Sequence, residues 1–407
     1  MEFIFINDNG KIDTLNLQSC ALSDETIKDK VFYSASSCKF TQARDFLKAY
    51  NSGAKLVLVD SYNKSLLQEV DALKIAPFGE DAKKTLFDMQ DFSVMLFTSG
   101  STGAATAVMK KKTHFDREID ALLTLFEGKK YKKIIVTVPF VHIYGLLFGL
   151  LLPMRLGVSV IVKQHFLPND LIELFEDDTL VVTTPLYIKS LLKGSPKQDF
   201  SKVTFCSSTA PLGAEVAQSF KQQFGSEVIQ FFGSTETGGI AYKEGATKYW
   251  RPLDGVKIGQ NSDGLLFVDS PFVSDTIYNK NIQKVQKPFQ TFDFVQMSDE
   301  GFELIGRDSK IFKVAGKRYS TLEMENILES LEGVERVLVE IAYNNESLRG
   351  EELIIYLQSK KKYKTIEIKK ILQNRLSNIQ FMLRLQFVDE IPLSQTGKKL
   401  SLKELQC

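Results

Sequence analysis

The sequence predicts an α/β protein with three parts: a large N-terminal domain of layered, mostly parallel sheets, a small β region, and a small C-terminal α+β domain. The first observation is that short apolar stretches alternate with segments of helical spacing up to about residue 245, which is the pattern of a parallel sheet. The second is a change to short strands and turns, followed by renewed alternation near residue 308. We place the large domain at residues 1–307, divided into 1–90, 91–245 and 246–307, and the small domain at 308–407.

Hydrophobic spacing locates the individual elements. In the large domain, strands are expected at residues 2–7, 55–60, 133–139, 158–162, 179–183 and 228–232, and helices at 43–50, 114–126, 167–176 and 214–224. In the small domain, strands are expected at 310–314, 334–342 and 352–358, and helices at 321–331 and 364–376. Because parallel strands end at one edge of a sheet, ligands are expected at that edge.

Composition excludes several classes of protein. Lys and Arg number 51 and Asp and Glu number 50, and this balance argues against a nucleic-acid-binding surface. The four cysteines and three histidines have no metal-ligand spacing, so we expect reduced thiols and a cytoplasmic protein. The apolar residues 146–162 are interrupted by Pro153, Arg155 and Gly157, which favours a buried helix and strand over a membrane span. No basic region precedes an apolar core at the N-terminus, so no signal peptide is expected.

The segment Thr-Ser-Gly-Ser-Thr-Gly at residues 98–103 follows an apolar strand end. Glycine allows the backbone to form a concavity with inward N–H groups, and such a concavity binds anions. Three lysines follow at residues 110–112, so the segment suits the polyphosphate of a nucleotide. A solvent-exposed turn or linker is the alternative. The P-loop of common NTPases fits poorly, because Gly103 is followed by Ala104 rather than by Lys.

Six further segments occur downstream in a fixed order. Together with the first, they are TSGSTG at 98–103, PFVHIYG at 139–145, SSTAPL at 207–212, FFGSTE at 231–236, TFD at 291–293, GRDSKIFKVAGKR at 306–318 and TGKK at 396–399. This series resembles the adenylate-forming (AMP-binding) family, which includes acyl- and aryl-CoA synthetases, luciferases and peptide-synthetase adenylation domains. Within the family, the segments HIYGLLFGLLLP and GSTETGGIAY look most like stand-alone acyl- or aryl-CoA synthetases.

The resemblance implies a reaction in two steps. The carboxylate of a small acid attacks the α-phosphate of ATP, which gives an acyl-adenylate and pyrophosphate, and a thiol then attacks the acyl-adenylate. ATP, Mg²⁺ and coenzyme A are the implied cofactor and substrates, and the small domain is implied to be mobile. Two alternatives stay open: an adenylating enzyme that loads a separate acyl-carrier protein, and a degenerate, non-catalytic adenylate-binding protein.

The resemblance also implies roles for individual residues. Lys398 would bridge the carboxylate and the α-phosphate, and a mobile cation suits the charge that grows there. Thr98 and Thr235 would complete the catalytic group, and Glu236 would supply an oxygen ligand to Mg²⁺; outside the motif, such an acid is often a helix cap or an ion-pair partner. The implied nucleotide contacts are Ser99, Gly100, Ser101, Thr102, Gly103, Ser208, Thr209, Ala210, Pro211, Phe232, Gly233, Ser234, Asp293 and Arg307. The implied acyl pocket contains His142, Tyr144, Gly145 and Gly238. The resemblance also places Gly316 in the thiol channel and Ser309 at the hinge between the domains.

The sequence departs from the family pattern at several positions. The first loop usually continues with Pro and Lys where this chain has Ala105 and Thr106, so we predict that Lys110 or Lys111 supplies the missing cation. The hinge is commonly Asp or Lys rather than Ser309, and Phe292 replaces a usual Gly. Only 97 residues precede Thr98, so the first subdomain is expected to be reduced, with a homodimer as one way to cover what it leaves exposed.

Overall fold

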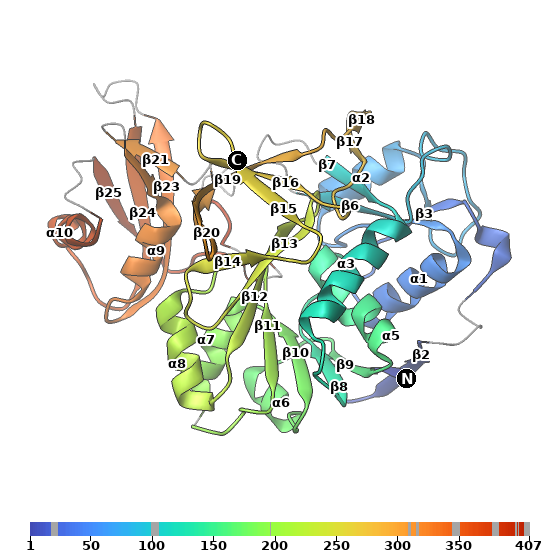
Figure 1. The fold of residues 1–407 in the computed structure, drawn as a ribbon, viewed down its shortest axis with the longest axis horizontal. Coiled ribbons are helices and arrows are strands. Elements are labelled where there is room, and N and C mark those ends of the chain that lie inside the picture. The colour runs from blue at the N-terminus through green and yellow to red at the C-terminus, as the bar shows by residue number, and fades with distance from the viewer. Residues whose placement is uncertain are drawn as a thin grey trace. The chain divides into compact units, whose positions relative to one another are not determined.

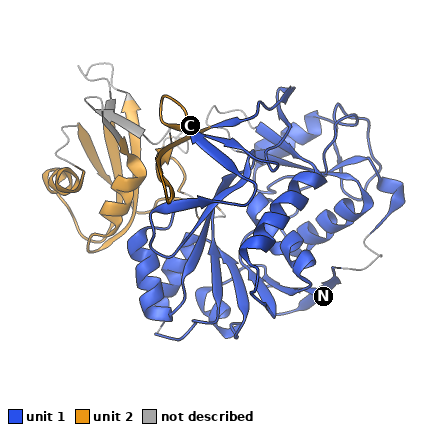
Figure 2. Cartoon of the chain, in the orientation of Figure 1, with its two compact units in different colours: residues 1–259, 267–290 blue, residues 260–266, 291–407 orange. Residues whose placement is uncertain are grey.

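The computed structural model describes residues 1–17, 23–98, 106–195, 197–307, 311–314, 317–343, 351–376, 382–394, 397 and 399–402. Two compact units divide the chain (Figure 2): unit 1 contains residues 1–259 and 267–290, and unit 2 contains residues 260–266 and 291–407. Strands β15 (Lys257–Gln260), β16 (Leu265–Asp269) and β19 (Phe289–Ser298) contain residues of both units. This division into compact units does not test the predicted boundary between the large and small domains at residue 307, which stays a prediction.

A long sheet forms the centre of unit 1 (Figure 1). From β14 onward its strand order is β14 (Tyr249–Pro252), β13 (Gly238–Glu244), β12 (Val228–Ser234), β11 (Thr204–Ser207), β10 (Thr179–Thr183), β8 (Lys133–Val136), β9 (Ser159–Lys163), β1 (Glu2–Ile6) and β2 (Ile12–Asn16). The strands from β12 to β1 are parallel, whereas β13, β14 and β2 run antiparallel to their neighbours. The predicted parallel sheet is therefore confirmed, and β8, β10, β11 and β12 share one carboxyl edge.

A second sheet in unit 1 carries the segment that precedes the hydroxyl-rich loop. Its strand order is β18 (Asn281–Lys284), β17 (Thr276–Asn279), β7 (Thr106–Lys110), β6 (Val94–Thr98), β4 (Lys55–Leu58), β3 (Val31–Ser34) and β5 (Ala76–Pro77). Strands β6 and β7 pair antiparallel with Thr98 opposite Thr106. The two ends of the 99–105 segment are therefore neighbours in this sheet.

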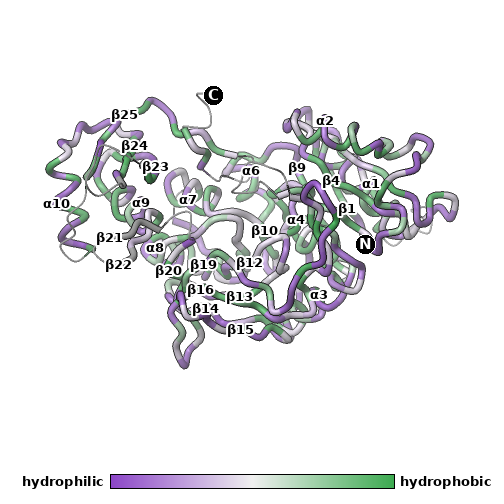
Figure 3. The backbone as a smooth tube through the Cα atoms, turned by 90° about the horizontal axis from the view of Figure 1, so that it is seen from above, coloured by the Kyte–Doolittle hydropathy of each residue, from purple (hydrophilic) through white to green (hydrophobic). Residues whose placement is uncertain are grey.

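Helices cover the sheets of unit 1. The helices α6 (Pro168–Glu173), α7 (Pro185–Gly194) and α8 (Ala214–Phe224) lie beside β10, β11 and β12 (Figure 1). A cluster of buried side chains joins them to these strands, with Phe205, Phe220 and Phe224 fully buried. The remaining helices are α1 (Lys39–Ser52), α2 (Lys64–Ala72), α3 (Lys112–Leu125), α4 (Ile143–Leu146), a π-helical turn (Leu147–Leu151), α5 (Leu152–Leu156) and a 3₁₀ turn (Glu25–Ile27). Hydrophobic residues gather around β10 and α4 (Figure 3).

Unit 2 contains a β-hairpin and a small α+β body. The hairpin is β19 with β20 (Gly301–Arg307), and a short pair, β21 (Ile311–Val314) and β22 (Lys317–Ser320), follows it. The sheet of the body has the order β23 (Val334–Tyr343), β24 (Glu351–Ser359) and β25 (Leu383–Phe387), and α9 (Thr321–Glu329) and α10 (Thr365–Arg375) pack on it. Met324, Leu328 and Leu372 are fully buried in that core, so the predicted α+β character is confirmed.

The structure corrects several boundaries. The predicted strand 133–139 ends at Val136; the N–H and the hydroxyl of the next residue, Thr137, both donate to the carbonyl of Val182, at 3.0 Å and 3.3 Å. The predicted helix 43–50 begins at Lys39. Helices α2 and α7 and strand β3 were missed by hydrophobic spacing. In the described part of the chain, no helix combines the length and the hydropathy that crossing a bilayer requires.

Candidate functional site

Two predicted nucleotide segments meet at the carboxyl edge of the long sheet. Ser208, just after β11, donates its hydroxyl to the backbone carbonyl of Phe231 in β12 at 3.0 Å. Thr209 has a φ of 78°, a left-handed conformation that non-glycine residues seldom adopt. Its backbone therefore turns sharply beside the end of β12. Ala210 is half-buried and Pro211 is exposed.

Phe232 lies on β12 with its side chain half-buried. Its ring centroid is 5.5 Å from that of Trp250, with an interplanar angle of 51°. Because successive side chains of a strand point to opposite faces, Phe231 projects to the other side, where its ring lies 4.7 Å from Phe148. The predicted adenine platform is therefore supported from behind by Trp250, a contact that the motif alone did not indicate.

The predicted loop at residues 233–239 is the tight turn of the β12–β13 hairpin. Ser234 and Thr237 close it: the Ser234 N–H donates to the Thr237 hydroxyl at 3.1 Å, and the Thr237 N–H donates to the Ser234 hydroxyl at 3.2 Å. Thr237 is fully buried, while Thr235 and Glu236 at the tip are half-buried. The turn thus presents the two residues with predicted chemical roles and uses Thr237, which sequence reasoning missed, to fix its shape.

Gly238 is required by this turn for two reasons. Its φ of 70° is unfavourable for residues with a side chain. A Cβ there would also lie 2.6 Å from Oε2 of Glu118 and 2.9 Å from Cβ of Phe272. The predicted part of Gly238 in an acyl pocket stays a prediction; its observed contacts are with these two buried side chains.

Lys110 lies beneath the turn and is fully buried. Its ammonium donates to the carbonyl of Phe272 at 2.7 Å and to the carbonyl of Glu236 at 3.3 Å. Burial lowers the pKa of Lys110 to about 8, although the charges of Glu118 and Glu236 oppose this. The prediction that Lys110 reaches the phosphates is wrong in this structure, because its ammonium is enclosed by the protein and bonded to backbone carbonyls.

Lys111 is also engaged elsewhere. Its ammonium lies 2.9 Å from a carboxylate oxygen of Asp91 and 3.2 Å from one of Asp275, and hydrogen bonds to these acids raise its pKa. The Lys111 side chain is 31% exposed, so the prediction that it supplies the missing cation stays a prediction, whereas the same prediction for Lys110 is wrong. Thr106, at the position of the missing lysine, accepts a hydrogen bond from the amide of Asn279 at 3.0 Å, and Thr98 donates to the Thr106 carbonyl at 3.2 Å.

Glu118, on α3, is a second buried charge under the turn that sequence reasoning missed. One of its oxygens accepts the N–H of Gly239, and burial raises the pKa of Glu118 to about 7. Its other oxygen has no hydrogen-bond partner among the described residues. A sequence signal existed: Glu118 follows Phe115 by three residues and precedes Leu122 by four, so it lies on the apolar face of the helix.

The predicted acyl-pocket segment follows β8. Gly145 packs so closely on Pro139 that a Cβ would overlap the Pro139 carbonyl. Tyr144 is buried, with its ring 4.8 Å from that of Phe148. His142 is half-buried, and its surroundings lower its pKa by desolvation, so the neutral imidazole is favoured. The structure fixes the backbone of this segment without testing its contact with an acid.

Lys39, another residue that the sequence did not single out, holds the start of this segment. Its ammonium donates to the carbonyl of Thr137 at 3.1 Å and to that of Lys163 at 3.0 Å. These carbonyls follow or end the parallel strands β8 and β9. Burial lowers the pKa of Lys39 to about 8. Lys39 and Lys110 thus use the same chemistry at different places, a buried ammonium on backbone carbonyls.

Asp293 and Arg307 face each other on the β19–β20 hairpin of unit 2. The Arg307 Nε and an Asp293 carboxylate oxygen are 3.9 Å apart, with Asp293 15% exposed and Arg307 53% exposed. Thr291 supports the position by accepting the Asp293 N–H at 3.1 Å. The structure thereby pairs two residues that were predicted to serve the ribose. Phe292, which replaces the usual Gly, is 57% exposed.

The predicted catalytic Lys398, the hinge Ser309, the channel Gly316 and the loop residues 99–103 lie outside the described residues. The neighbours of Lys398 are described. The Gly397 N–H donates to the Ser394 carbonyl at 2.8 Å, and the Lys399 ammonium lies 2.8 Å from Glu325 and 2.7 Å from Glu329. These acids raise the pKa of Lys399 against the opposing effect of its burial.

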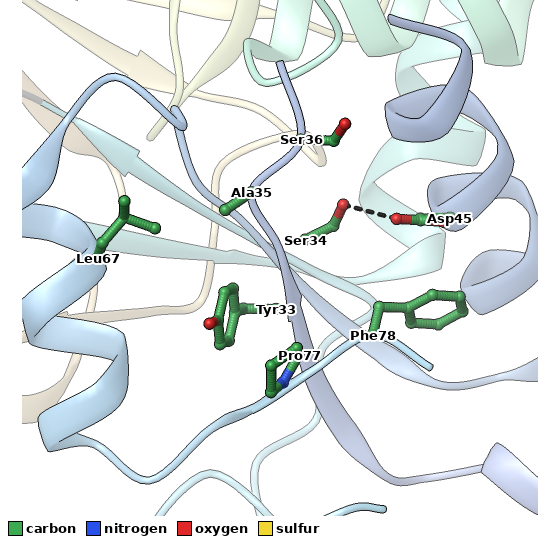
Figure 4. A pocket seen from close by; sticks show the side chains of 8 residues that line it. All are labelled: Tyr33, Ser34, Ala35, Ser36, Asp45, Leu67, Pro77 and Phe78. Carbon is green, nitrogen blue, oxygen red and sulfur yellow. Dashed lines mark hydrogen bonds between the residues drawn. The ribbon is translucent and has the colours of Figure 1, made fainter. Parts of the chain in front are cut away.

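A pocket of about 390 Å³ lies elsewhere in unit 1 (Figure 4). It is lined by Tyr33, Ser34, Ala35, Ser36, Asp45, Leu67, Pro77 and Phe78, none of which was predicted as a site residue. Asp45 accepts the Ser34 hydroxyl at 2.9 Å and pairs with Arg44 at 3.0 Å. This lining includes a carboxylate and no lysine or arginine, so it does not suit a polyphosphate.

A parallel sheet with polar turns at its carboxyl edge is the arrangement in which α/β proteins bind their ligands. The family described as AMP-binding enzyme matches residues 5–261. The chain therefore belongs to the AMP-binding enzyme family, which confirms the resemblance inferred from its motifs.

Relatives and solved structures agree with this assignment. The chain is 24% identical to a long-chain-fatty-acid–CoA ligase of Bacillus subtilis over 78% of its length, and 26% identical to a 4-coumarate–CoA ligase of Halorhodospira halophila over 64%. It covers 62% and 63% of those proteins, respectively. O-succinylbenzoate coenzyme A synthetase from Bacillus subtilis, in complex with ATP and magnesium ion, superposes with a TM-score of 0.81 at 18% identity, covering 98% of this chain and 95% of that one. That similarity shows a shared fold.

The environment of His114 generates a prediction about pH. Burial lowers the pKa of His114 from 6.5 to about 4, and its Nδ1 accepts the Lys111 N–H at 3.2 Å. As pH falls below about 6.5, the unfolded chain takes up this proton first, so the free energy of unfolding decreases until about pH 4. His114→Asn keeps an acceptor but does not titrate. Urea unfolding between pH 7.5 and 5 should therefore show a smaller loss in the variant, and equal losses would contradict the assignment.

The ion pairs of Lys399 generate a second prediction. Lys399→Met leaves Glu325 and Glu329, which are 5% and 12% exposed, without their cation. The free energy of unfolding of unit 2 should fall by about 3 kcal/mol, near the lower end for a broken buried pair because Lys399 is 21% exposed. Lys360→Met is the control: Lys360 is 86% exposed beside Glu335, so its loss should be below about 1 kcal/mol. Similar losses in both variants would refute a structural role for Lys399.

Proposed function

We propose that this protein activates a carboxylic acid with ATP and transfers the acyl group to the thiol of coenzyme A. A carboxylate oxygen forms a bond to the α-phosphorus and pyrophosphate leaves; the thiol sulfur then forms a bond to the acyl carbon and AMP leaves. The observation that carries the proposal is the contact between the Ser208 segment and β12, which brings two nucleotide motifs to one sheet edge. The named activities of the curated relatives support the second step.

The described residues fit parts of this reaction. Thr235 and Glu236 form a half-buried hairpin tip beside Phe232, where a hydroxyl can donate to a phosphate and a flat ring can stack on adenine. Asp293 offers a carboxylate for ribose hydroxyls, and its pairing with Arg307 orients it. Lys398, in the TGKK motif, is proposed to offset the charge that develops between the two substrates.

Glu236 is proposed to hold Mg²⁺. No cluster of three acidic, histidine or cysteine ligands occurs among the described residues. One carboxylate suffices for this role, because Mg²⁺ keeps several waters and is otherwise bound by substrate phosphates. When bound, the ion would neutralise negative charge on the phosphates. The fit is good: the Glu236 side chain is half-buried at the tip, and its backbone is held by Lys110 and by the N–H of Ser274.

A screen of aromatic and aliphatic acids for ATP-dependent pyrophosphate release tests the proposed activity and identifies the acid. The same screen, repeated with coenzyme A or with a purified acyl-carrier protein, identifies the acceptor by the thioester formed. Nucleotide binding without pyrophosphate release from any acid would leave only the adenylate-binding alternative.

Glu236→Gln should raise the Mg²⁺ concentration needed for half-maximal pyrophosphate release by about tenfold or more, because a charge-assisted contact contributes about 1.5–3 kcal/mol. Glutamine keeps the shape of the side chain and removes its charge. Glu244→Gln is the matched control, since Glu244 is an exposed acid at the other end of the same hairpin. An unchanged Mg²⁺ requirement in Glu236→Gln would remove this residue from the metal site.

The two-step reaction predicts that its steps can be separated by mutation. Lys398→Ala should reduce adenylate formation by about a hundredfold or more, the scale for removing a preorganised charge, and should still convert a supplied acyl-adenylate to thioester. Gly316→Trp should release pyrophosphate but accumulate acyl-adenylate, because a side chain there is expected to block the thiol. Pyrophosphate and thioester are measured separately; equal loss of both steps in folded Lys398→Ala would contradict a rotating small domain.

A further inference from the structure

Two oppositely charged side chains are buried under the turn that carries Thr235 and Glu236. Lys110, the last residue of β7, is 0% exposed, and Glu118, in α3, is 2% exposed. Each influences the pKa of the other, so they share one electrostatic environment. Neither belongs to a motif identified in the sequence.

Lys110 fixes the tip of the turn, at Glu236. Its ammonium bonds to the carbonyls of Glu236 and Phe272, which are separated by more than thirty residues in the sequence. The same Glu236 carbonyl accepts the Ser274 N–H at 2.9 Å. Lys110 itself lies in the strand that begins at Thr106, directly after the hydroxyl-rich segment. One side chain therefore connects the strand that follows the first phosphate motif to the backbone of the proposed metal ligand.

Glu118 fixes the place where the turn joins β13. Its carboxylate accepts the N–H of Gly239, the residue that pairs with Gly233 across the hairpin. Gly238 lets the carboxylate approach, since a Cβ there would lie 2.6 Å from its second oxygen. The turn is thus held at its tip by a cation on the Glu236 carbonyl and at the start of β13 by an anion on the Gly239 N–H.

This arrangement is unfavourable if only the stability of the fold is considered. Burying two charges costs desolvation energy, and replacing a buried pair by apolar side chains of similar volume is often neutral or stabilising. A hydrogen bond to a backbone group, in contrast, fixes that group in distance and direction. The charges are best explained by the position that they impose on the turn.

Building on the proposed function, we propose that Lys110 and Glu118 are positioning residues of the nucleotide site. They hold the Glu236 turn at a fixed place relative to the strand that follows the 98–103 motif, so that Glu236 can hold Mg²⁺ on the phosphates. Neither contacts the nucleotide itself.

The decisive variant is Lys110→Met/Glu118→Met, with each single change beside it. Each single change buries a charge without its opposite, so its urea midpoint should fall; the double change removes both charges and should regain much of that loss. If the pair only stabilises the fold, Mg·ATP binding should recover with the midpoint. If it positions the turn, the gain in ATP affinity caused by Mg²⁺ should stay reduced by about tenfold in the double variant. Calorimetric titration with ATP, with and without Mg²⁺, measures this gain.

Two further variants sharpen the comparison. Glu118→Gln keeps an oxygen that can accept the Gly239 N–H, so it should retain most of the Mg²⁺-dependent gain that Glu118→Met loses. Lys39→Met is the matched control, because Lys39 is a buried lysine on two strand-end carbonyls far from the Glu236 turn in the sequence. It should lower the urea midpoint and leave the Mg²⁺-dependent gain unchanged.

The outcomes separate this proposal from the proposed activity. A folded double variant with the wild-type Mg²⁺-dependent gain would overturn the positioning role, as would an equal loss of that gain in Lys39→Met. If the wild type binds Mg·ATP but releases pyrophosphate with no acid, the activity fails and the binding comparison still decides the role of the pair. If the wild type does not bind Mg·ATP, both proposals fail.

Discussion

The hydrogen bonds from the Lys110 ammonium to two backbone carbonyls join the two sheets of unit 1 at the edge where the predicted nucleotide motifs lie. A strand edge is held in place mainly by its neighbours, and the tip of a hairpin has neighbours on few sides. The β12–β13 tip gains from Lys110 a connection to β7, which belongs to the other sheet. An ammonium suits this task because it has three donors on a flexible stem and can satisfy carbonyls that are not aligned. The internal Ser234–Thr237 bonds shape the tip, and Lys110 determines where that shape lies.

The parts of the fold that sequence reasoning predicted are those with a strong local pattern. Helix α8 begins at Ala214 and ends at Phe224 as predicted, because its apolar spacing is regular and Gly225 ends it in a left-handed conformation. Strand β10 was also placed correctly, since all its residues are buried between two layers. Strand β3, only four residues long, has no comparable periodicity, and helix α7 follows β10 so closely that its start at Pro185 was concealed. The motifs predicted a site at the strand ends, and two of the segments that carry it are in contact there through Ser208 and Phe231.

The parts of the site that the sequence did not reveal depend on long-range contacts between charged groups and backbone. A lysine in a basic run, such as Lys110, is ordinarily solvated, and nothing in its neighbours along the chain indicates that the Glu236 and Phe272 carbonyls surround it. The hypothesis that Lys110 replaces the missing phosphate cation failed for this reason, since its ammonium is enclosed by the protein and bonded to backbone carbonyls. Lys39 was concealed in the same way. Glu118 was also missed, but it differs from the two lysines because the hydrophobic spacing of its helix places it on the apolar face.

The aromatic contacts from Tyr144 through Phe148 to Phe231 also constrain how such a protein can diversify. Phe231 precedes Phe232, so a ring on one face of β12 packs against the segment after β8 while its neighbour on the other face is the predicted adenine platform. A change of volume at Phe148 would be transmitted to the strand that carries this predicted platform, because packed interiors transmit strain. Under the proposed function, new acid preferences are therefore more accessible through half-buried positions of the predicted acyl-pocket segment, such as His142, than through these rings. Duplicated copies of the gene would be expected to diverge first at such half-buried positions and last along this aromatic row.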